Sequence, residues 1–122
     1  MDNQEYKNLL LRRTKKFSID VINFADDILQ RGLSKRIVLS QLIRSATSIG
    51  ANIIEAQAAS SRKDFINFIH YALKSANETC YWLELLKETT RGDPVVVEHL
   101  LREAKELSKL LGSSVLALKG RK

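Results

Sequence analysis

The sequence predicts an all-α protein, a single domain over residues 1–122 folded as an up-and-down antiparallel four-helix bundle. Apolar residues recur at spacings of three and four through four long segments, which is the pattern of helices that each bury one face. Only a few residues separate these segments, so sequential helices are expected to run antiparallel. The 122 residues include one proline and five glycines, too few for an all-β protein with many tight turns.

The first helix is expected over residues 7–30. Gly32 suits the left-handed backbone position that follows a helix end. The apolar face of this helix is formed by residues at spacings of three, four and seven, namely Leu10, Phe17, Val21, Phe24, Ala25 and Ile28.

The second helix is expected over residues 35–58. Ser34 is the expected N-cap, because a serine hydroxyl accepts a hydrogen bond from a free N–H of the first turn. The apolar face is formed by Val38, Leu42, Ala46, Ile49, Ile53 and Ala56.

The third helix is expected over residues 62–90, where Ser61 and Asp64 have the spacing of a capping box. Its core positions alternate spacings of four and three, as in closely packed, nearly parallel helices. These positions are Phe65, Ile69, Ala72, Ala76, Thr79, Leu83 and Leu86.

The fourth helix is expected over residues 94–118, after the clearest break in the chain. Gly92 ends one helix, Asp93 caps the next, and Pro94 stands in the first turn, where its missing N–H costs nothing. The apolar face is formed by Val97, Leu100, Leu101, Ala104, Leu107, Leu111, Val115 and Leu118.

Positive charge is concentrated in the first half of the chain. The formal net charge is +6, and residues 1–63 hold eleven lysines and arginines against six acidic residues, whereas residues 64–88 are slightly acidic. A basic half is typical of a protein that binds a polyanion such as nucleic acid, but it also serves simply to solvate a bundle. A lone cysteine, Cys80, indicates no disulfide, and neither a signal peptide nor a membrane span is expected. The expected location is cytoplasmic.

No catalytic, metal or cofactor site is recognisable in the sequence. His70 and His99 lack the glutamate three residues earlier that di-iron bundles need. Cys80 flanks the core and is expected to act as a small buried hydrophobe. Gly50 lies within a helix and lacks the Gly-Lys-Ser/Thr ending of a phosphate loop. We therefore expect a non-enzymatic protein without cofactors, although an enzyme whose site is shared between subunits stays open.

Two helices carry a second apolar stripe beside the core face. One stripe includes Ile19, Ile22 and Leu29, and the other includes Tyr71, Trp82 and Leu85. Tryptophan and tyrosine favour interfaces, because each buries a large area and keeps a polar tip. The stripes predict a homo-oligomer interface, and the alternative is a wide core with partly exposed aromatic rims.

One side of the second helix carries a row of polar residues next to its apolar face. Such a row either binds a ligand or forms hydrogen bonds and ion pairs between helices that fix their register, and we favour the second interpretation. The row consists of Gln41, Arg44, Ser48, Asn52 and Glu55.

Residues 41–86 carry a specific combination of short motifs. These motifs are Arg44-Ser45-Ala46, Ser48-Ile49-Gly50-Ala51-Asn52-Ile53 with Glu55, Ser61 with Asp64-Phe65, Ala76-Asn77-Glu78 and Trp82-Leu83. Over this segment, more than a third of the chain, the sequence strongly resembles the 23S rRNA intervening-sequence protein family, also called four-helix bundle proteins. Ala56 departs from the pattern, because many members carry glycine after the glutamate, so the end of the second helix is expected to be more regular here.

The resemblance implies a small bacterial protein, often encoded within an insertion in the large-subunit ribosomal RNA gene. Members of the family form ring-like pentamers of four-helix bundles, so the resemblance implies a homopentamer. A similar bundle is the basic accessory protein of diversity-generating retroelements, where it binds RNA and reverse transcriptase.

The leading functional hypothesis is a homo-oligomeric protein that binds structured RNA, in preference to DNA, through its phosphates. The alternative is an assembly or adaptor protein that binds a protein partner through an exposed apolar stripe. The position of the charges in the assembled oligomer distinguishes the two hypotheses. Under the first, the expected nucleic-acid contacts are Arg12, Arg13, Lys15, Lys16, Lys35 and Arg36.

Overall fold

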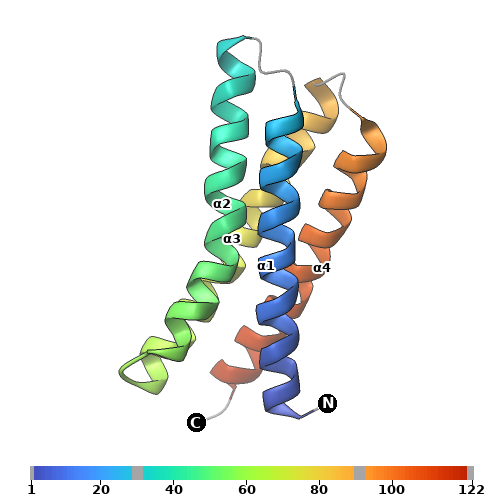
Figure 1. Ribbon diagram of the computed structural model, residues 1–122. Coiled ribbons are helices and arrows are strands. Elements are labelled where there is room, and N and C mark those ends of the chain that lie inside the picture. The colour runs from blue at the N-terminus through green and yellow to red at the C-terminus, as the bar shows by residue number, and fades with distance from the viewer. Residues whose placement is uncertain (1, 29–31, 90–92, 121–122) are drawn as a thin grey trace.

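The computed structural model describes residues 2–28, 32–89 and 93–120, and within these ranges the chain forms four helices and no strand. The helices run up and down, and α4 returns beside α1, so that both chain ends lie at one end of the molecule (Figure 1). The prediction of an all-α fold with four helices is confirmed. The helices are α1 (Asn3–Asp27), α2 (Leu33–Gln57), α3 (Arg62–Thr89) and α4 (Pro94–Lys119).

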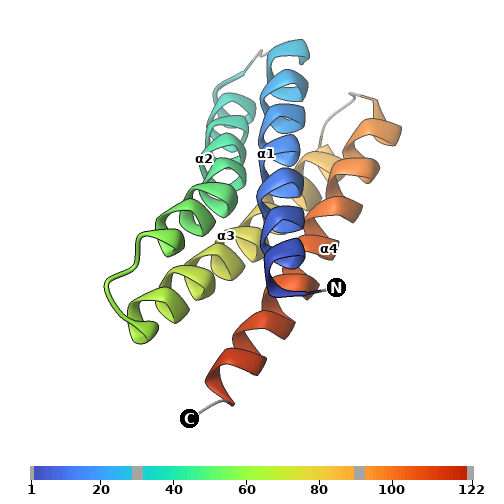
Figure 2. The same cartoon turned by 60° about the horizontal axis from the view of Figure 1, so that its bottom comes forward.

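The four helix pairs differ in how closely they pack. The α2–α3 and α3–α4 pairs pack most closely, and the α1–α4 pair packs least closely. Figure 2 brings the end with the two chain termini forward and shows the last turns of α4 set apart from the start of α1. The bundle is therefore loosest along the α1–α4 boundary.

The core contains almost all of the residues predicted from the helical spacing, each helix burying one face. The exceptions, Ile28, Val38, Phe65 and Leu118, are only partly buried and lie within six residues of a helix end. At the start of α2, Leu39 is buried in place of Val38. The spacing therefore identifies the buried face correctly and loses accuracy only where neighbouring helices diverge.

The first helix begins four residues earlier than predicted. Asp2 is its N-cap, and the Asp2 carboxylate accepts a hydrogen bond from the backbone N–H of Glu5 at 2.7 Å. The helix ends at Asp27, because Ile28 has an extended backbone with φ −78° and ψ 131°. The predicted end at residue 30 lies outside the described residues.

The predicted cap of the second helix is wrong. α2 begins at Leu33, so Ser34 lies inside the first turn, and Gly32 is the N-cap without a side-chain hydrogen bond. Gly32 has φ +93° and ψ 142°, a positive φ as predicted, but it precedes α2 rather than closing α1 in a left-handed turn. The backbone freedom of this glycine sets the start of α2 and overrides the capping preference of Ser34.

The other two helix starts follow the sequence closely. The Ser61 hydroxyl accepts a hydrogen bond from the N–H of Asp64 at 3.1 Å, while the Asp64 carboxylate accepts one from the N–H of Ser60 at 3.1 Å. This is a capping box in which the reciprocal bond is displaced by one residue. Asp93 caps α4 through the N–H of Val95 at 2.9 Å, and Pro94 is the first helical residue, as predicted. Gly92 lies outside the described residues.

Small residues let α2 approach both of its neighbours. On one side, the hydroxyls of Ser45 and Thr79 are buried and hydrogen-bond each other at 2.9 Å between α2 and α3. On the other side, a Cβ atom added at Gly50 would lie 3.1 Å from the hydroxyl oxygen of Thr14 and 3.3 Å from its Cβ. Thr14 is held in place because its hydroxyl donates to the carbonyl of Leu10 at 2.7 Å. Gly50 is therefore a close-approach glycine, as its neighbourhood of small residues indicates.

Replacing Gly50 by alanine should lower the stability of the bundle, although alanine is the better helix former. We expect Gly50→Ala to reduce the free energy of unfolding by about 1 kcal/mol, because overpacking against Thr14 outweighs a propensity gain of similar size. Gly112→Ala is the matched control, since the nearest atom to its added Cβ is Leu73 Cδ1 at 4.0 Å. It should stabilise the protein by up to about 1 kcal/mol. Urea unfolding of both variants tests this, and equal stabilities would contradict it.

Candidate nucleic-acid interface

The predicted basic residues of α1 fall on two different sides of the helix. Arg12 and Lys15 are exposed on the side opposite the core, and neither forms an ion pair with another described residue. Arg13 points instead toward α4, and Lys16 pairs within its own helix. Of the four predicted contacts on this helix, two are therefore free to meet a phosphate group.

Arg13 is held in the boundary between α1 and α4. Its guanidinium donates two hydrogen bonds to Glu103 at 3.1 and 2.5 Å, and the two side chains are 27% and 28% exposed. The pKa of Arg13 is raised, mainly by the hydrogen bond to Glu103, so the charge persists at every physiological pH. A two-point arginine–carboxylate contact is the strongest geometry for such a pair. Arg13 thus joins two helices, and its charge is already matched.

Lys16 is weakly constrained by comparison. Its ammonium lies 2.8 Å from the carboxylate of Asp20, one turn later, and the lysine side chain is 74% exposed. The hydrogen bond to Asp20 is the main reason that the pKa of Lys16 is raised. Because exposed pairs of this kind contribute little, Lys16 can exchange Asp20 for another anion.

Lys35 and Arg36 lie at a distance from the other four predicted contacts. They stand in the first turn of α2, at the end of the bundle where α1 finishes. At 1.5 Å per residue, they are separated from residues 12–16 by roughly 20 Å along the helix axis. Lys35 is partly buried and Arg36 is exposed. The six predicted residues therefore do not form one continuous patch on a single chain.

A second basic row on α4 was missed by the sequence interpretation. Arg102, Lys105 and Lys109 are exposed and form no ion pair within the described part of the chain. Their spacings of three and four place them on one side of α4, away from its buried leucines. That spacing is visible in the sequence, but the excess of basic residues in the first half of the chain is the more obvious feature.

The predicted oligomer-interface residues differ in exposure. Ile19, Ile22 and Tyr71 are 48%, 40% and 50% exposed, so these three do present apolar surface to solvent. Leu85 is partly buried, and so is Trp82, which packs against the core. The remaining predicted residue, Leu29, lies outside the described residues.

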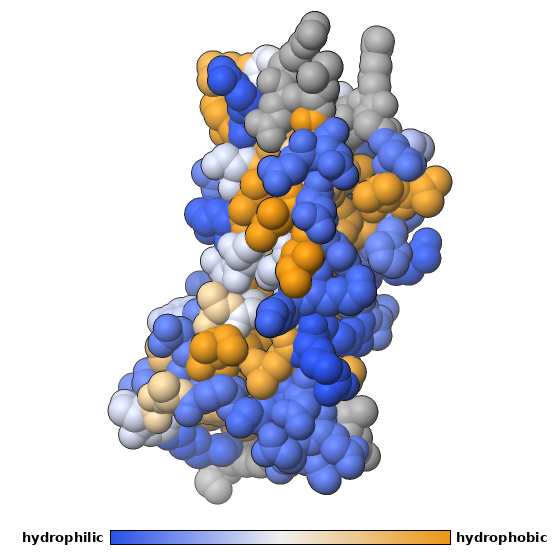
Figure 3. All heavy atoms as spheres, viewed as in Figure 1, coloured by the Kyte–Doolittle hydropathy of each residue, from blue (hydrophilic) through white to orange (hydrophobic). Residues whose placement is uncertain are grey.

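The outer face of α2 is a further apolar surface that the spacing argument missed. Leu33, Ile37 and Ile54 are 68%, 51% and 59% exposed, and Arg44 is the only charged residue between Arg36 and Glu55. Figure 3 shows hydrophobic side chains gathered along the boundary of α1 and α2, among the charged side chains of α1. The sequence does indicate this surface, because α2 has very few charged residues on any of its sides.

By length and composition alone, α2 is also long and apolar enough to cross a membrane. A core helix of a soluble protein passes the same test, so this finding is weak evidence for insertion. Only 33% of its most apolar window is buried inside the bundle, although one face packs between α1 and α3. The apolar character of α2 therefore exceeds what the core of one chain uses.

Most of the polar row on α2 is satisfied within the protein. Arg44 donates to Gln41 in its own helix at 2.9 Å and forms an ion pair with Glu78 of α3. The same Glu78 carboxylate accepts a hydrogen bond from the indole N–H of Trp82 at 2.8 Å. Ser48 and Asn52 donate to backbone carbonyls one turn earlier, at 2.9 and 2.8 Å. The row thus links α2 to α3 at Arg44, as favoured above, while Ser48 and Asn52 bond within the helix.

Potential metal ligands and the single cysteine are the remaining side chains to consider for a site. Among the described residues, no group of three or more histidine, cysteine or acidic side chains is close enough to hold a metal ion. Burial raises the pKa of the Cys80 thiol, so the thiol stays protonated and is a poor nucleophile.

Comparison with known proteins places this architecture in a family. The sequence profile of the family described as 23S rRNA-intervening sequence protein matches residues 7–113. The chain belongs to this family. A crystal structure of a protein of unknown function from the S23 ribosomal protein family of Bacteroides thetaiotaomicron is 38% identical. The similarity covers 90% of this chain and 97% of that chain with a TM-score of 0.80. No curated protein matches the chain.

The family match includes α2, α3 and most of α1 and α4. The six predicted nucleic-acid contacts, the basic row of α4 and the outer face of α2 all lie within residues 7–113. The expected resemblance to the 23S rRNA intervening-sequence protein family is thus confirmed over a longer segment than the one whose motifs suggested it.

The link between α2 and α3 at Glu78 can be tested through Trp82, the single tryptophan of this family member. Glu78→Ala should lower the free energy of unfolding by about 1 kcal/mol and change the tryptophan emission, because it leaves the indole N–H and Arg44 without their partner. Glu84→Ala is the control, since Glu84 is exposed on the same helix and forms no ion pair among the described residues. Equal stabilities and spectra for the two variants would show that the link contributes nothing.

Proposed function

We propose that this protein is a non-enzymatic, cytoplasmic homo-oligomer that binds structured RNA through basic side chains on its outer surface. The observation that carries the proposal is a set of exposed lysine and arginine side chains on two adjacent helices. These side chains lie opposite the core and have no ion-pair partners among the described residues. Arg12 and Lys15 belong to α1, and Arg102, Lys105 and Lys109 belong to α4. Unpaired lysines and arginines release counterions from the phosphates when they bind, and this release is the main source of affinity for nucleic acids.

The distribution of aromatic residues supports recognition of the RNA backbone and shape. The exposed tyrosines Tyr71 and Tyr81 lie on α3, whereas the unpaired lysines and arginines lie on α1 and α4. Base stacking needs aromatic rings close to the phosphate-binding residues, and the exposed residues of those two helices include no phenylalanine, tyrosine or tryptophan. The family description, which refers to 23S rRNA, supports RNA over DNA as the nucleic acid.

Oligomerisation would turn these separate charges into a larger binding surface. The exposed apolar residues Ile22, Ile37 and Ile54 are candidates for burial between copies of the chain, in the pentameric ring that the sequence resemblance implies. Each added copy repeats the same basic rows, so several weak phosphate contacts act together on one RNA.

RNA binding should depend steeply on salt and on Arg12 and Lys15. We expect the variant with Arg12→Glu and Lys15→Glu to bind structured RNA at least about tenfold more weakly, because it reverses two free charges. The control with Lys63→Glu and Lys74→Glu has the same net charge but changes exposed residues of α3. Filter binding at several salt concentrations measures both variants, and an affinity independent of salt would contradict the proposal.

Self-association should depend on the outer face of α2. We expect the wild-type protein to form a defined oligomer, and the variant with Ile37→Glu and Ile54→Glu to dissociate, because buried unpaired carboxylates oppose assembly. The control with Val95→Glu and Leu116→Glu changes two exposed apolar residues of α4 by the same charge. Light scattering after size exclusion gives the masses, and a wild-type mass of one chain would rule out the oligomer.

An adaptor that binds a protein partner is the second candidate, favoured by two pairs of aromatic residues on α3. The Tyr81 and Trp82 rings meet edge to face with centroids 5.1 Å apart, and Phe68 and Tyr71 do so at 6.1 Å. Exposed tyrosines beside partly buried aromatic rings are typical of protein interfaces. An oligomer that ignores RNA at low salt would favour this candidate.

A further inference from the structure

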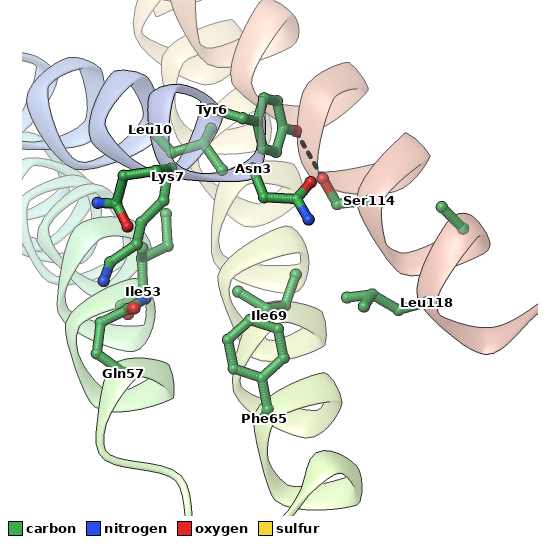
Figure 4. Close-up of a pocket in the computed structure, with 12 residues that line it drawn as sticks. Asn3, Tyr6, Lys7, Leu10, Ile53, Gln57, Phe65, Ile69, Ser114 and Leu118 are labelled. Carbon is green, nitrogen blue, oxygen red and sulfur yellow. Dashed lines mark hydrogen bonds between the residues drawn. The ribbon is translucent and has the colours of Figure 1, made fainter. Parts of the chain in front are cut away.

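A pocket of about 380 Å³ opens at the end of the bundle that carries both chain ends (Figure 4). All four helices line it, α1 and α3 with their first turns and α2 and α4 with their last turns. It lies beside the boundary of α1 and α4, the helix pair that packs least closely. Its volume falls within the range of about 300–1,000 Å³ that is typical of small-molecule sites.

One wall of the pocket is apolar. Phe65, Ile69 and Leu118 lie together on the α3 and α4 side, and Leu10 and Ile53 continue this surface toward α1 and α2 (Figure 4). Phe65 and Leu118 are predicted core residues that remain only partly buried. The pocket therefore exposes apolar side chains that the core of a single chain leaves uncovered, and covering them is favourable.

The opposite side of the pocket carries one free cation. Among the described residues that line the pocket, Lys7 alone is charged; it is partly buried and forms no ion pair or hydrogen bond within the described chain. Several neighbouring polar groups are already engaged. The Tyr6 hydroxyl lies 2.6 Å from the Ser114 hydroxyl, and the Gln57 amide donates to the Ile53 carbonyl at 2.9 Å. The Asn3 amide also lines the pocket, so the Lys7 ammonium is the charged donor that remains for a ligand, beside a neutral one.

We propose that this pocket binds a small amphipathic monocarboxylate, with its carboxylate at Lys7 and its apolar body against Phe65, Ile69 and Leu118. The single cation matches one negative charge, and Figure 4 shows it on the α1 and α2 side, across from the apolar wall. A phosphate ester carries a second negative charge that would face apolar side chains without a partner, which is unfavourable. A bound carboxylate would connect α1 and α2 to α3 and α4 at this end of the bundle.

Octanoate is the probe, titrated into the purified full chain by calorimetry and followed in parallel by thermal unfolding. We expect saturable binding of octanoate and a rise in Tm that increases with its concentration. Octanol and octylamine have the same chain without the carboxylate, and both should bind at least about tenfold more weakly. Octanol that binds as tightly as octanoate, or octanoate that does not bind, would overturn the proposal.

Two variants separate the head-group contact from the apolar wall. Lys7→Gln should weaken octanoate binding to the level of octanol, whereas Lys109→Gln, an exposed lysine of α4 outside the pocket, should leave it unchanged. Ala117→Phe should abolish binding of both ligands, since Ala117 lines the pocket and is exposed, so a larger side chain fills the pocket without entering the core. Octanoate binding that survives Lys7→Gln and Ala117→Phe would place it elsewhere on the protein and overturn the proposal.

Discussion

The position of α2 between α1 and α3 depends on small side chains, and much of the remaining structure follows from it. Gly50 lets α2 approach Thr14 of α1, and Ser45 meets Thr79 of α3 through a buried hydrogen bond. Because protein interiors are close-packed, neither contact leaves room for a larger residue. With both flanks of α2 occupied in this way, its third face is left to solvent, and Ile54 on that face is 59% exposed. The close packing of α2 and its exposed apolar face are thus two consequences of one arrangement.

The sequence predicts the helices well because their buried faces repeat every three or four residues. It predicts the turn between α1 and α2 poorly, since a serine at position 34 satisfies the statistics of a cap while the positive φ of Gly32 decides where the helix begins. The exposure of Arg12 follows from its place opposite the core face. The pairing of Arg13 with Glu103 could not be predicted, because the partner lies 90 residues away and no local pattern connects them.

The boundary between α1 and α4 is held by polar contacts more than by close packing. Arg13 binds Glu103 near the middle of the boundary, and Tyr6 binds Ser114 close to one end. Long side chains of this kind join helices across a wider gap than leucine and alanine do, which explains why the pair is loose and why a pocket opens beside Tyr6. A ligand bound in this pocket would add contacts beside the helix pair that packs least closely, and it would stabilise the folded chain by binding it in preference to the unfolded one.

Ion pairing decides which charges stay available to a partner. Within the described part of the chain, four pairs use Asp20, Glu78, Glu98 and Glu103, and three of them join two helices, at Arg13, Arg44 and Lys87. These pairs neutralise lysine and arginine side chains close to the helix boundaries. They leave Arg12, Lys15 and the basic row of α4 without an acidic partner on outward-facing surfaces. In the proposed oligomer, another copy of the chain covers the apolar face of α2, while the outward-facing lysines and arginines of α1 and α4 stay in solvent. The same association that buries the apolar surface would therefore repeat the positive charge around the assembly.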